Sequence, residues 1–240
     1  MSTVDHEEIE KFAKIATEWW NPEGKFKPLH MLNPIRIQYI RDQIISHFNI
    51  KSQDYCPLKE LQLLDIGCGG GLIAEPMARL GGTVTAIDAS NTNIEIATEH
   101  SKNAGLSINY LHNTVEELAN SKQKFDIILA LEIIEHVADI DQFISACRSL
   151  LNSSGIMFIS TLNRTVNSFL QSIIAAEYIL RWLPVGTHNW SKFILPSELS
   201  KYLRQHNLEP REIKGIKFNL LQQHWYLSED ISNNYIMYIC

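Results

Sequence analysis

The sequence has few cysteines, no surplus of positive charge and no long apolar run. Its four cysteines lie far apart without a C-x-x-C pair, which argues against both a disulfide framework and a zinc cluster. The formal net charge of −6 leaves no broadly basic surface for a phosphate backbone, so we expect no nucleic-acid partner. No stretch approaches the roughly 18 apolar residues of a membrane-spanning helix. The acidic start, MSTVDHEEIEKFAKIA, lacks the apolar core of a secretory signal, and these absences together predict a cytoplasmic protein.

What the sequence does have is a regular alternation of strand-like apolar runs and helical segments. Its 240 residues, 45% of them hydrophobic, are enough for one α/β domain. Strands are predicted at 61–67, 83–90, 108–113, 125–132 and 156–163, helices at 72–81 and 93–105, and a helix followed by a turn at 140–155. Strands separated by single helices predict a doubly wound, mostly parallel, Rossmann-like sheet.

Helical pieces precede this alternation. Apolar residues recur at helical spacing over 5–20, and Asn33 and Pro34 look like the N-cap and first residue of a second helix that runs to about Phe48. We therefore expect residues 1–50 to form a helical cap and residues 51–240 to form the main unit, the two making one structural domain.

A glycine-rich loop follows the first predicted strand. In LLDIGCGGGLIAE, Gly67 and Gly69 allow the backbone to turn tightly and approach a ligand beyond the carboxyl ends of the strands. A dinucleotide-binding loop would have glycine where this chain has Leu72, which disfavours a nicotinamide-dependent oxidoreductase. Asp88 ends the next strand, 17 positions after Gly71, where a carboxylate accepts hydrogen bonds from ribose hydroxyls. The combination indicates a nucleoside cofactor such as S-adenosylmethionine, rather than a structural turn followed by a capping aspartate.

Two further sites admit more than one interpretation. Asp65, just before the loop, either meets the sulfonium or amino group of such a cofactor or caps local amides. The fourth strand, FDIILALE, is expected to end beside the first, with Leu131 lining the cofactor pocket. The i, i+3, i+4 spacing of Glu132, Glu135 and His136 puts them on one face if a helical turn follows. Such a set suits a divalent cation or supplies a general base, whereas the alternative is two solvated glutamates and a turn-capping histidine.

Several longer blocks carry a resemblance to a known family. The blocks DHEEIEKFAKIATEWWNPEGKFKPLHMLNPIR, LLDIGCGGGLIAEPMA, EIIEHV, STLNRT and AAEYILRWLPVGTHNWSKFILPSEL together resemble ubiquinone-biosynthesis O-methyltransferases, from about residue 5 to about residue 199. The resemblance implies a class I methyltransferase fold with a seven-stranded sheet. It also implies methyl transfer from S-adenosylmethionine to a ring hydroxyl of 2-polyprenyl-6-hydroxyphenol and of 3-demethylubiquinol. The alternatives are a methyltransferase for another phenolic small molecule and a non-catalytic lipid-surface or scaffold protein that kept the fold.

The resemblance also implies roles for individual residues. It makes Arg36, Gly67, Asp88 and Leu131 cofactor contacts, and it makes Glu132, Glu135 and His136 ligands of a magnesium-like ion. Arg36 either clamps the methionyl carboxylate or is merely an exposed arginine of an amphipathic helix. A phenol with a pKa near 10 is mostly neutral at pH 7, so the enzyme needs either an ion that favours the phenolate or His136 as a base. The sequence leaves both open.

The polyprenyl tail implied for the acceptor requires contact with a membrane. An apolar insertion follows the fifth predicted strand at about residues 163–192, where three basic residues against one acidic residue give a net charge of +2. A basic amphipathic helix with tryptophan near its end is typical of a segment lying on anionic lipid, whereas the alternative is a helical lid over the active site. We expect a cytoplasmic protein attached peripherally to the inner face of the membrane, near other ubiquinone-pathway enzymes.

Overall fold

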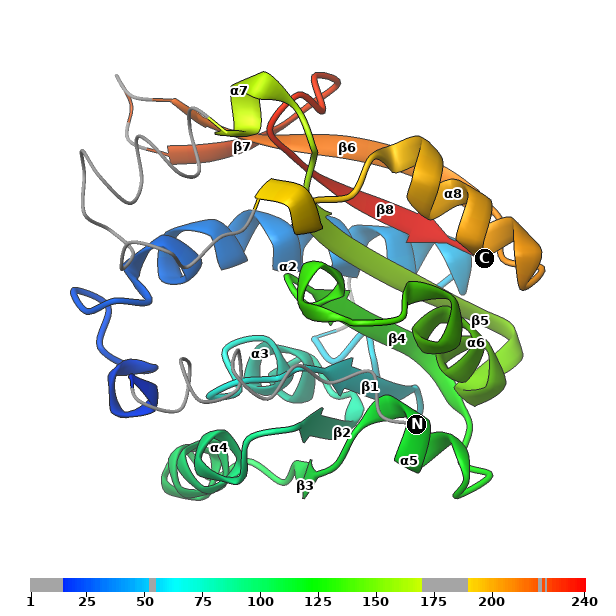
Figure 1. Ribbon diagram of the computed structural model, residues 1–240. Helices are drawn as coiled ribbons and strands as arrows, with labels where there is room; N and C mark the ends of the chain where they lie inside the picture. The colour runs from blue at the N-terminus through cyan, green and yellow to red at the C-terminus, as the bar shows by residue number, and fades with distance from the viewer. Residues whose placement is uncertain (1–14, 52–54, 170–189, 220–221, 223) are drawn as a thin grey trace.

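A computed structural model of the chain describes residues 15–51, 55–169, 190–219, 222 and 224–240 (Figure 1). Its described residues form one sheet in the order β3-β2-β1-β4-β5-β8-β6-β7. The strands are β1 (Gln62–Ile66), β2 (Thr83–Asp88), β3 (Asn109–His112), β4 (Phe125–Leu131), β5 (Leu151–Leu162), β6 (Pro210–Asn219), β7 (His224–Ser228) and β8 (Asn234–Ile239). β1 to β5 pair in parallel, and the last three strands are antiparallel.

This sheet confirms the doubly wound, mostly parallel α/β fold. It has eight strands in the described part of the chain instead of the predicted seven, because the chain folds back after β6 and adds β7 as an edge strand. β5 also begins at Leu151, inside the stretch 140–155 that was predicted to be a helix followed by a turn. Leu151 pairs with Phe125, and the register shifts between Phe125 and Ile127, so the first part of β5 is an irregular extension of the pairing.

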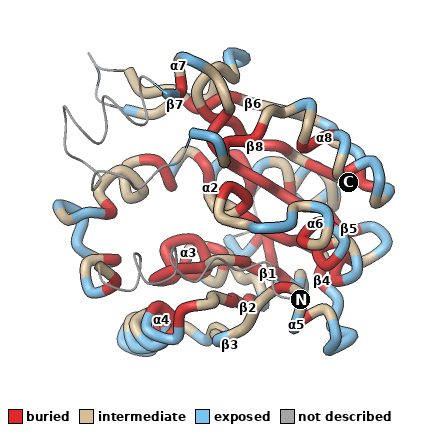
Figure 2. Tube along the Cα trace, viewed as in Figure 1, coloured by how far each residue is buried: buried red, intermediate tan, exposed pale blue. Residues whose placement is uncertain are grey.

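Helices cover both faces of the sheet. They are η1 (Ala16–Glu18), α2 (Lys27–His47), α3 (Ala74–Arg79), α4 (Asn91–Asn103), α5 (Val115–Ala119), η2 (Ile134–His136), α6 (Ile140–Leu150), α7 (Val166–Ser168), η4 (Trp190–Lys192) and α8 (Pro196–Gln205). Side chains of α2, α3 and α4 pack in one buried cluster, which we call the α2 face. Side chains of α5, α6 and α8 pack in another, the α6/α8 face. The strands between the two clusters form the buried centre of the molecule (Figure 2).

β5 shows how the sequence divides the two faces. Ile156 and Phe158 belong to the α2 face, and Met157 and Ile159 belong to the α6/α8 face. Successive side chains of a strand point to opposite faces. The polar residues Ser160 and Thr161, which follow in the same strand, therefore also point to opposite faces of the sheet.

Helix α2 begins earlier than predicted. It starts at Lys27 and contains Pro34 in its interior, so Asn33 is a helical residue and not an N-cap. A proline there removes a backbone hydrogen bond and costs about 3 kcal/mol. Burial of one isoleucine contributes about 1.5–3 kcal/mol, so Ile40 and Ile44, both at 0% exposure, offset that cost. Packing on the sheet has overridden the local signal at Asn33 and Pro34.

Two predicted segments are described only in part. The helix predicted over 5–20 falls mostly outside the described residues, and its described end contains the short turn η1. The apolar insertion at 163–192 is described at its two ends, where α7 and η4 lie. None of the helices within the described ranges has both the length and the apolarity to cross a bilayer.

Candidate functional site

The glycine loop lies where the strand order reverses. β1 pairs with β2 on one side and with β4 on the other, so the ends of β1 and β4 are neighbours as predicted. Gly67 has a φ of +69°, and a Cβ there would lie 2.7 Å from Cδ1 of Ile133, which follows β4. Only glycine satisfies both the backbone conformation and the close approach. The loop and the segment containing Glu132 and Glu135 are thus in direct contact.

Asp88 holds this loop in place. Its Oδ2 accepts a hydrogen bond from the Gly69 amide at 2.9 Å, and its Oδ1 accepts from the Ser90 amide at 2.8 Å and from Asn93 Nδ2 at 3.2 Å. Burial raises the pKa of Asp88, and these hydrogen bonds oppose the rise. A carboxylate has about four lone-pair sites, so these three bonds leave room for a further donor such as a hydroxyl.

Asp65 caps a helix, which is one of the two roles that the sequence left open, and one of its oxygens has no partner among the described residues. It is 3% exposed, and burial together with the nearby Asp88 raises its pKa to about 7. A backbone hydrogen bond from Ala74, at the start of α3, lowers it. Its Oδ2 has no hydrogen-bond partner among the residues the structure describes. The carboxylate therefore caps α3 and still presents one buried oxygen, which is a feature of sites that bind a ligand.

The tryptophans of the N-terminal segment, Trp19 and Trp20, pack against the glycine loop. A Cβ on Gly69 would overlap the ring of Trp19, whose Nε1 donates to Asn93 Oδ1 at 3.0 Å. Trp20 Nε1 donates to the Gly70 carbonyl at 2.9 Å. Because Asn93 also donates to Asp88, it links the N-terminal segment to the ribose-binding candidate. Sequence reasoning missed Asn93, since helix α4 gives no motif that distinguishes it.

Arg36 and Glu132 meet on the α2 face. Arg36 is 2% exposed and its Nη2 donates to Glu132 Oε1, so the alternative of a solvent-exposed arginine is wrong. Ser160 Oγ donates to the same oxygen at 2.9 Å. Glu132 has a φ of +55°, which is uncommon for a residue other than glycine. The Nε of Arg36 is buried without a partner in the described part of the chain, so the guanidinium retains an unused donor.

Glu135 and His136 lie on the other side of the sheet. Glu135 is 4% exposed, and its Oε2 accepts from Thr161 Oγ1 at 2.8 Å. Burial and Glu132 raise the pKa of Glu135, whereas His136 lowers it. Because Ser160 and Thr161 point to opposite faces, the two glutamates that bind them do not share the single face that their spacing predicted.

This separation bears on the predicted magnesium-like ion. Across the described ranges, no three His, Cys, Asp or Glu side chains gather closely enough to hold a metal ion. Glu132 is held by Arg36 and Ser160, and Glu135 is held by Thr161. The arrangement of Glu132, Glu135 and His136 thus does not fit an ion cage, and a cage would require these hydrogen bonds to break.

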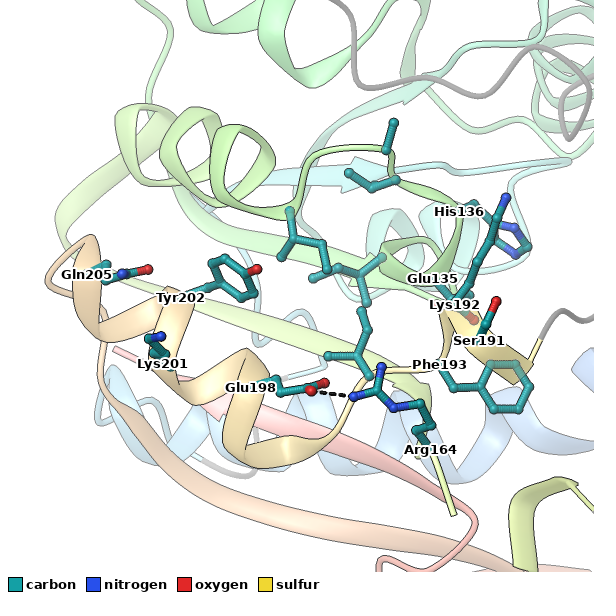
Figure 3. A pocket seen from close by; sticks show the side chains of 15 residues that line it. Glu135, His136, Arg164, Ser191, Lys192, Phe193, Glu198, Lys201, Tyr202 and Gln205 are labelled. Atoms are coloured by element: carbon teal, nitrogen blue, oxygen red, sulfur yellow. Dashed lines mark hydrogen bonds and ion pairs between the residues drawn. The ribbon is translucent and has the colours of Figure 1, made fainter. Parts of the chain in front are cut away.

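Glu135 and His136 instead line a pocket of about 670 Å³ on the α6/α8 face (Figure 3). Its walls come from η2, the start of α6, the segment 191–194 and α8. Leu131 ends β4 on the opposite side, half-buried against the α2 face. Beyond the carboxyl ends of β4 and β5, Leu131 therefore lies on the α2 face, and Glu135 and His136 lie beside the pocket on the α6/α8 face.

Comparison with known proteins identifies a matching family and several similar proteins. A family described as a methyltransferase domain matches residues 64–159. The chain is 54% identical over 236 residues to the ubiquinone biosynthesis O-methyltransferase of Pelagibacter ubique, with 98% of each chain covered. It is 50% identical over 235 residues to the protein of the same name in Dinoroseobacter shibae, with 98% of this chain and 95% of that one covered.

Solved structures share the fold at low sequence identity. Magnesium protoporphyrin IX methyltransferase from Synechocystis PCC 6803, solved with bound S-adenosylmethionine, superposes with a TM-score of 0.64 and 14% identity over 100% of this chain and 99% of that one. An S-adenosylmethionine-dependent methyltransferase from Clostridium acetobutylicum gives a TM-score of 0.62 and 14% identity, with 96% and 97% covered. At these identities the likeness establishes the architecture alone.

Proposed function

Because the chain belongs to the family of ubiquinone biosynthesis O-methyltransferases, we propose that it methylates a ring hydroxyl of 2-polyprenyl-6-hydroxyphenol and of 3-demethylubiquinol. The chain is an S-adenosylmethionine-dependent O-methyltransferase. The observation that carries the proposal is the contact between Gly67 and Ile133, which puts the cofactor loop beside Glu132, Glu135 and His136.

The cofactor roles follow from the groups around the loop. Gly67 and Gly69 let the backbone approach the nucleoside, and Asp88 accepts from its ribose. Asp65 faces the positively charged amino or sulfonium end with its free oxygen. Leu131, which ends β4, is proposed to contact the cofactor as well. The role of Asp65 is supported by its buried Oδ2, which lacks a protein partner in the described ranges, since such atoms in a folded protein commonly serve a ligand.

Arg36 is proposed to bind the methionyl carboxylate of the cofactor. Its buried guanidinium has five donors and uses one of them on Glu132, while Nε has no partner in the described ranges. A second carboxylate therefore finds an unused donor without first breaking the pair with Glu132. Arginine is well suited to carboxylates because its planar fork allows two parallel hydrogen bonds.

The reaction is an in-line displacement at the methyl carbon, and the sulfonium is already a good leaving group. The protein must therefore align the two reactants and help the phenol lose its proton. We assign the proton to His136, which lies with Glu135 in the wall of the pocket. Histidine is the side chain that most often acts as a general base, and its imidazole can accept this proton.

The magnesium requirement implied by the resemblance stays a prediction. If an ion binds, it would act as a Lewis acid on the phenolic oxygens. Glu132, Glu135 and His136 do not fit that role in their present arrangement, because the two carboxylates are held on opposite sides of the end of β5. We therefore expect methyl transfer to continue when divalent ions are removed.

Peripheral attachment to the membrane is supported by apolar residues at the two ends of the insertion. Val166 is 73% exposed, Phe169 is 39% exposed and Trp190 is 38% exposed. The rings of Phe169 and Trp190 lie 6.4 Å apart, so the two ends of the insertion meet at one apolar site on the surface. A site of this kind suits the interface of an anionic membrane on the cytoplasmic side. Co-sedimentation with anionic and neutral vesicles, comparing the wild type with Phe169→Ser/Trp190→Ser, measures this attachment, and equal sedimentation of both proteins would contradict it.

The decisive experiment follows methyl transfer from labelled S-adenosylmethionine to a short-tailed 2-polyprenyl-6-hydroxyphenol and to unsubstituted catechol, with and without EDTA. We expect transfer to the prenylated phenol that EDTA leaves intact and that His136→Ala reduces by about 100-fold, the usual scale for a general base. Loss of activity in EDTA that Mg²⁺ restores would show that the carboxylates rearrange around an ion. Transfer to catechol alone would favour another phenolic acceptor, and tight cofactor binding without any transfer would contradict the proposed acceptor class.

A further inference from the structure

The pocket that begins at Glu135 and His136 extends well beyond them. One wall is formed by η2 and the start of α6, and the other by the segment 191–194 and α8. Glu135 and His136 lie at one end, and Lys201 and Gln205 lie at the other (Figure 3). The volume of about 670 Å³ is within the range of small-molecule sites, about 300–1,000 Å³. A phenol ring at His136 would occupy only one end of it.

The middle of the pocket is apolar. Val137, Ile140 and Tyr202 line it and pack against the α6/α8 core, yet they stay only partly buried. Phe193 and Ile194, both buried, line it as well, in the same wall as Tyr202. Side chains drawn in carbon alone lie between the labelled ends (Figure 3). Partly exposed apolar side chains that converge on one channel favour an apolar occupant.

The charged side chains that line the pocket are Arg164, Lys192 and Lys201 against Glu135 and Glu198, so no strong excess of one sign favours an ionic occupant. Arg164 and Glu198 form an ion pair with each other, so the arginine already has a counter-charge. Lys201 lies at the open end, where a long side chain keeps its ammonium in water. Polar groups at both ends and carbon between them match a molecule with a hydroxylated ring and a hydrocarbon chain.

We propose that this pocket holds the proximal part of the acceptor's hydrocarbon tail, with the hydroxylated ring at Glu135 and His136. The inference rests on the proposed function, since it takes the acceptor to be a phenol with an isoprenoid tail. The tail runs past Val137 and Ile140 toward the outer surface of α8. The tail displaces water from these side chains, so it makes the enzyme prefer tailed acceptors and does more than hold the substrate at the membrane.

The test compares two acceptors that differ in the tail alone. Methyl transfer from labelled S-adenosylmethionine is measured for catechol and for catechol bearing a geranyl group beside one hydroxyl, and the ratio of their kcat/KM values is the readout. Ala138→Phe puts a ring into the pocket from an exposed lining position, where the core has no need to rearrange. The matched control is Ala104→Phe, at the C-cap of α4 and outside the lining. Tyr202→Ala provides a second variant that removes apolar wall instead of filling the channel.

We expect the wild type to prefer the geranyl acceptor, and both pocket variants to lower that preference by about tenfold, the scale of a changed contact in an apolar specificity pocket. The control should keep the wild-type ratio. An unchanged ratio in both pocket variants, with both acceptors still methylated, would overturn the pocket assignment and leave the proposed function standing. Failure of the wild type to methylate either acceptor would instead contradict the proposed function.

Discussion

The pKa of Asp65 makes cofactor affinity depend on pH in a definite direction. Burial and Asp88 raise this pKa to about 7 in the cofactor-free protein. A positively charged group beside its free oxygen binds the ionised form, so the apparent dissociation constant is divided by the ionised fraction. That fraction is about one in eleven at pH 6, about one half at pH 7 and about ten in eleven at pH 8. Affinity should therefore rise about fivefold from pH 6 to pH 7 and less than about twofold from pH 7 to pH 8.

Isothermal titration with S-adenosylhomocysteine, whose amino group retains the positive charge, measures this effect. Repeating the titration at pH 6 in buffers of different ionisation enthalpy counts the protons released, which we expect to be about 0.9 per ligand. Asp65→Asn should bind more weakly and lose the slope between pH 6 and pH 7. His112 also interacts with this carboxylate cluster, since it lowers the pKa of Asp88, and the Asp65 variant separates its contribution. A dissociation constant that is flat from pH 6 to pH 8, or an unchanged slope in Asp65→Asn, would refute the reasoning.

The raised pKa of Asp65 makes the stability of the apoprotein fall as pH rises, whereas cofactor affinity rises with pH. The folded apoprotein keeps a proton on Asp65 that the unfolded chain releases above its ordinary pKa of 3.8. The contribution of Asp65 to stability is therefore fully present below that value and is lost as pH rises toward about 7. Bound cofactor should reverse this loss, because it stabilises the ionised carboxylate.

Three further outcomes follow from the contacts of the site. Gly69→Ala places a Cβ against Trp19 at a φ of +52°. The backbone strain alone should lower the free energy of unfolding by about 1–2 kcal/mol. A melting temperature equal to that of the wild type would contradict this. Ser160→Ala should raise the KM for the cofactor by releasing Glu132 from its hydrogen bond, whereas Thr161→Val should raise the KM for the acceptor. Each KM should rise by roughly fivefold, because the lost hydrogen bond is worth about 1 kcal/mol. Equal effects of each variant on both substrates would contradict the separation of the two faces. Trp20→Phe loses the bond to the glycine-loop carbonyl, and cofactor affinity measured by titration should fall by several-fold.

The sequence predicted those parts of the site that depend on the local order of strands and loops. Gly67 and Asp88 occur at the ends of successive strand-like runs, and the rule that ligands bind beyond the carboxyl ends of parallel strands brings them together. The adjacency of β1 and β4 followed from the same rule. Local order was therefore enough to predict that the candidate cofactor residues lie close together.

The parts that sequence did not predict depend on residues far apart in the chain. Arg36 and Glu132 are separated by 96 positions, and Trp19 and Asn93 by 74. No periodic pattern connects such pairs, because their meeting depends on how α2 and the N-terminal segment pack on the sheet. The signal that was available was the polar pair at the end of the apolar strand, where Ser160 has few reasons to be buried unless it has a polar partner.

The one-face prediction for Glu132 and Glu135 had a different weakness. It assumed that the chain enters a regular helical turn directly after β4. Glu132 instead takes a left-handed conformation, and only the residues from Ile134 to His136 form a turn, of the tighter 3₁₀ type. A single residue with positive φ was enough to send neighbouring carboxylates to opposite sides of the sheet, and this conformation has no reliable sequence signature when the residue is a glutamate.

At the end of β5, strand register decides the face of the sheet to which each side chain points. Ser160 holds Glu132 on the proposed cofactor side, and Thr161 holds Glu135 on the proposed acceptor side. Deleting one residue between Gly155 and Ile159 would move each hydroxyl to the other face of the sheet, and neither glutamate would keep its present partner although no residue of the site had changed. The spacing inside this strand is therefore as much a part of the active site as the residues themselves, and length variation should be confined to segments such as the connection between β6 and β7.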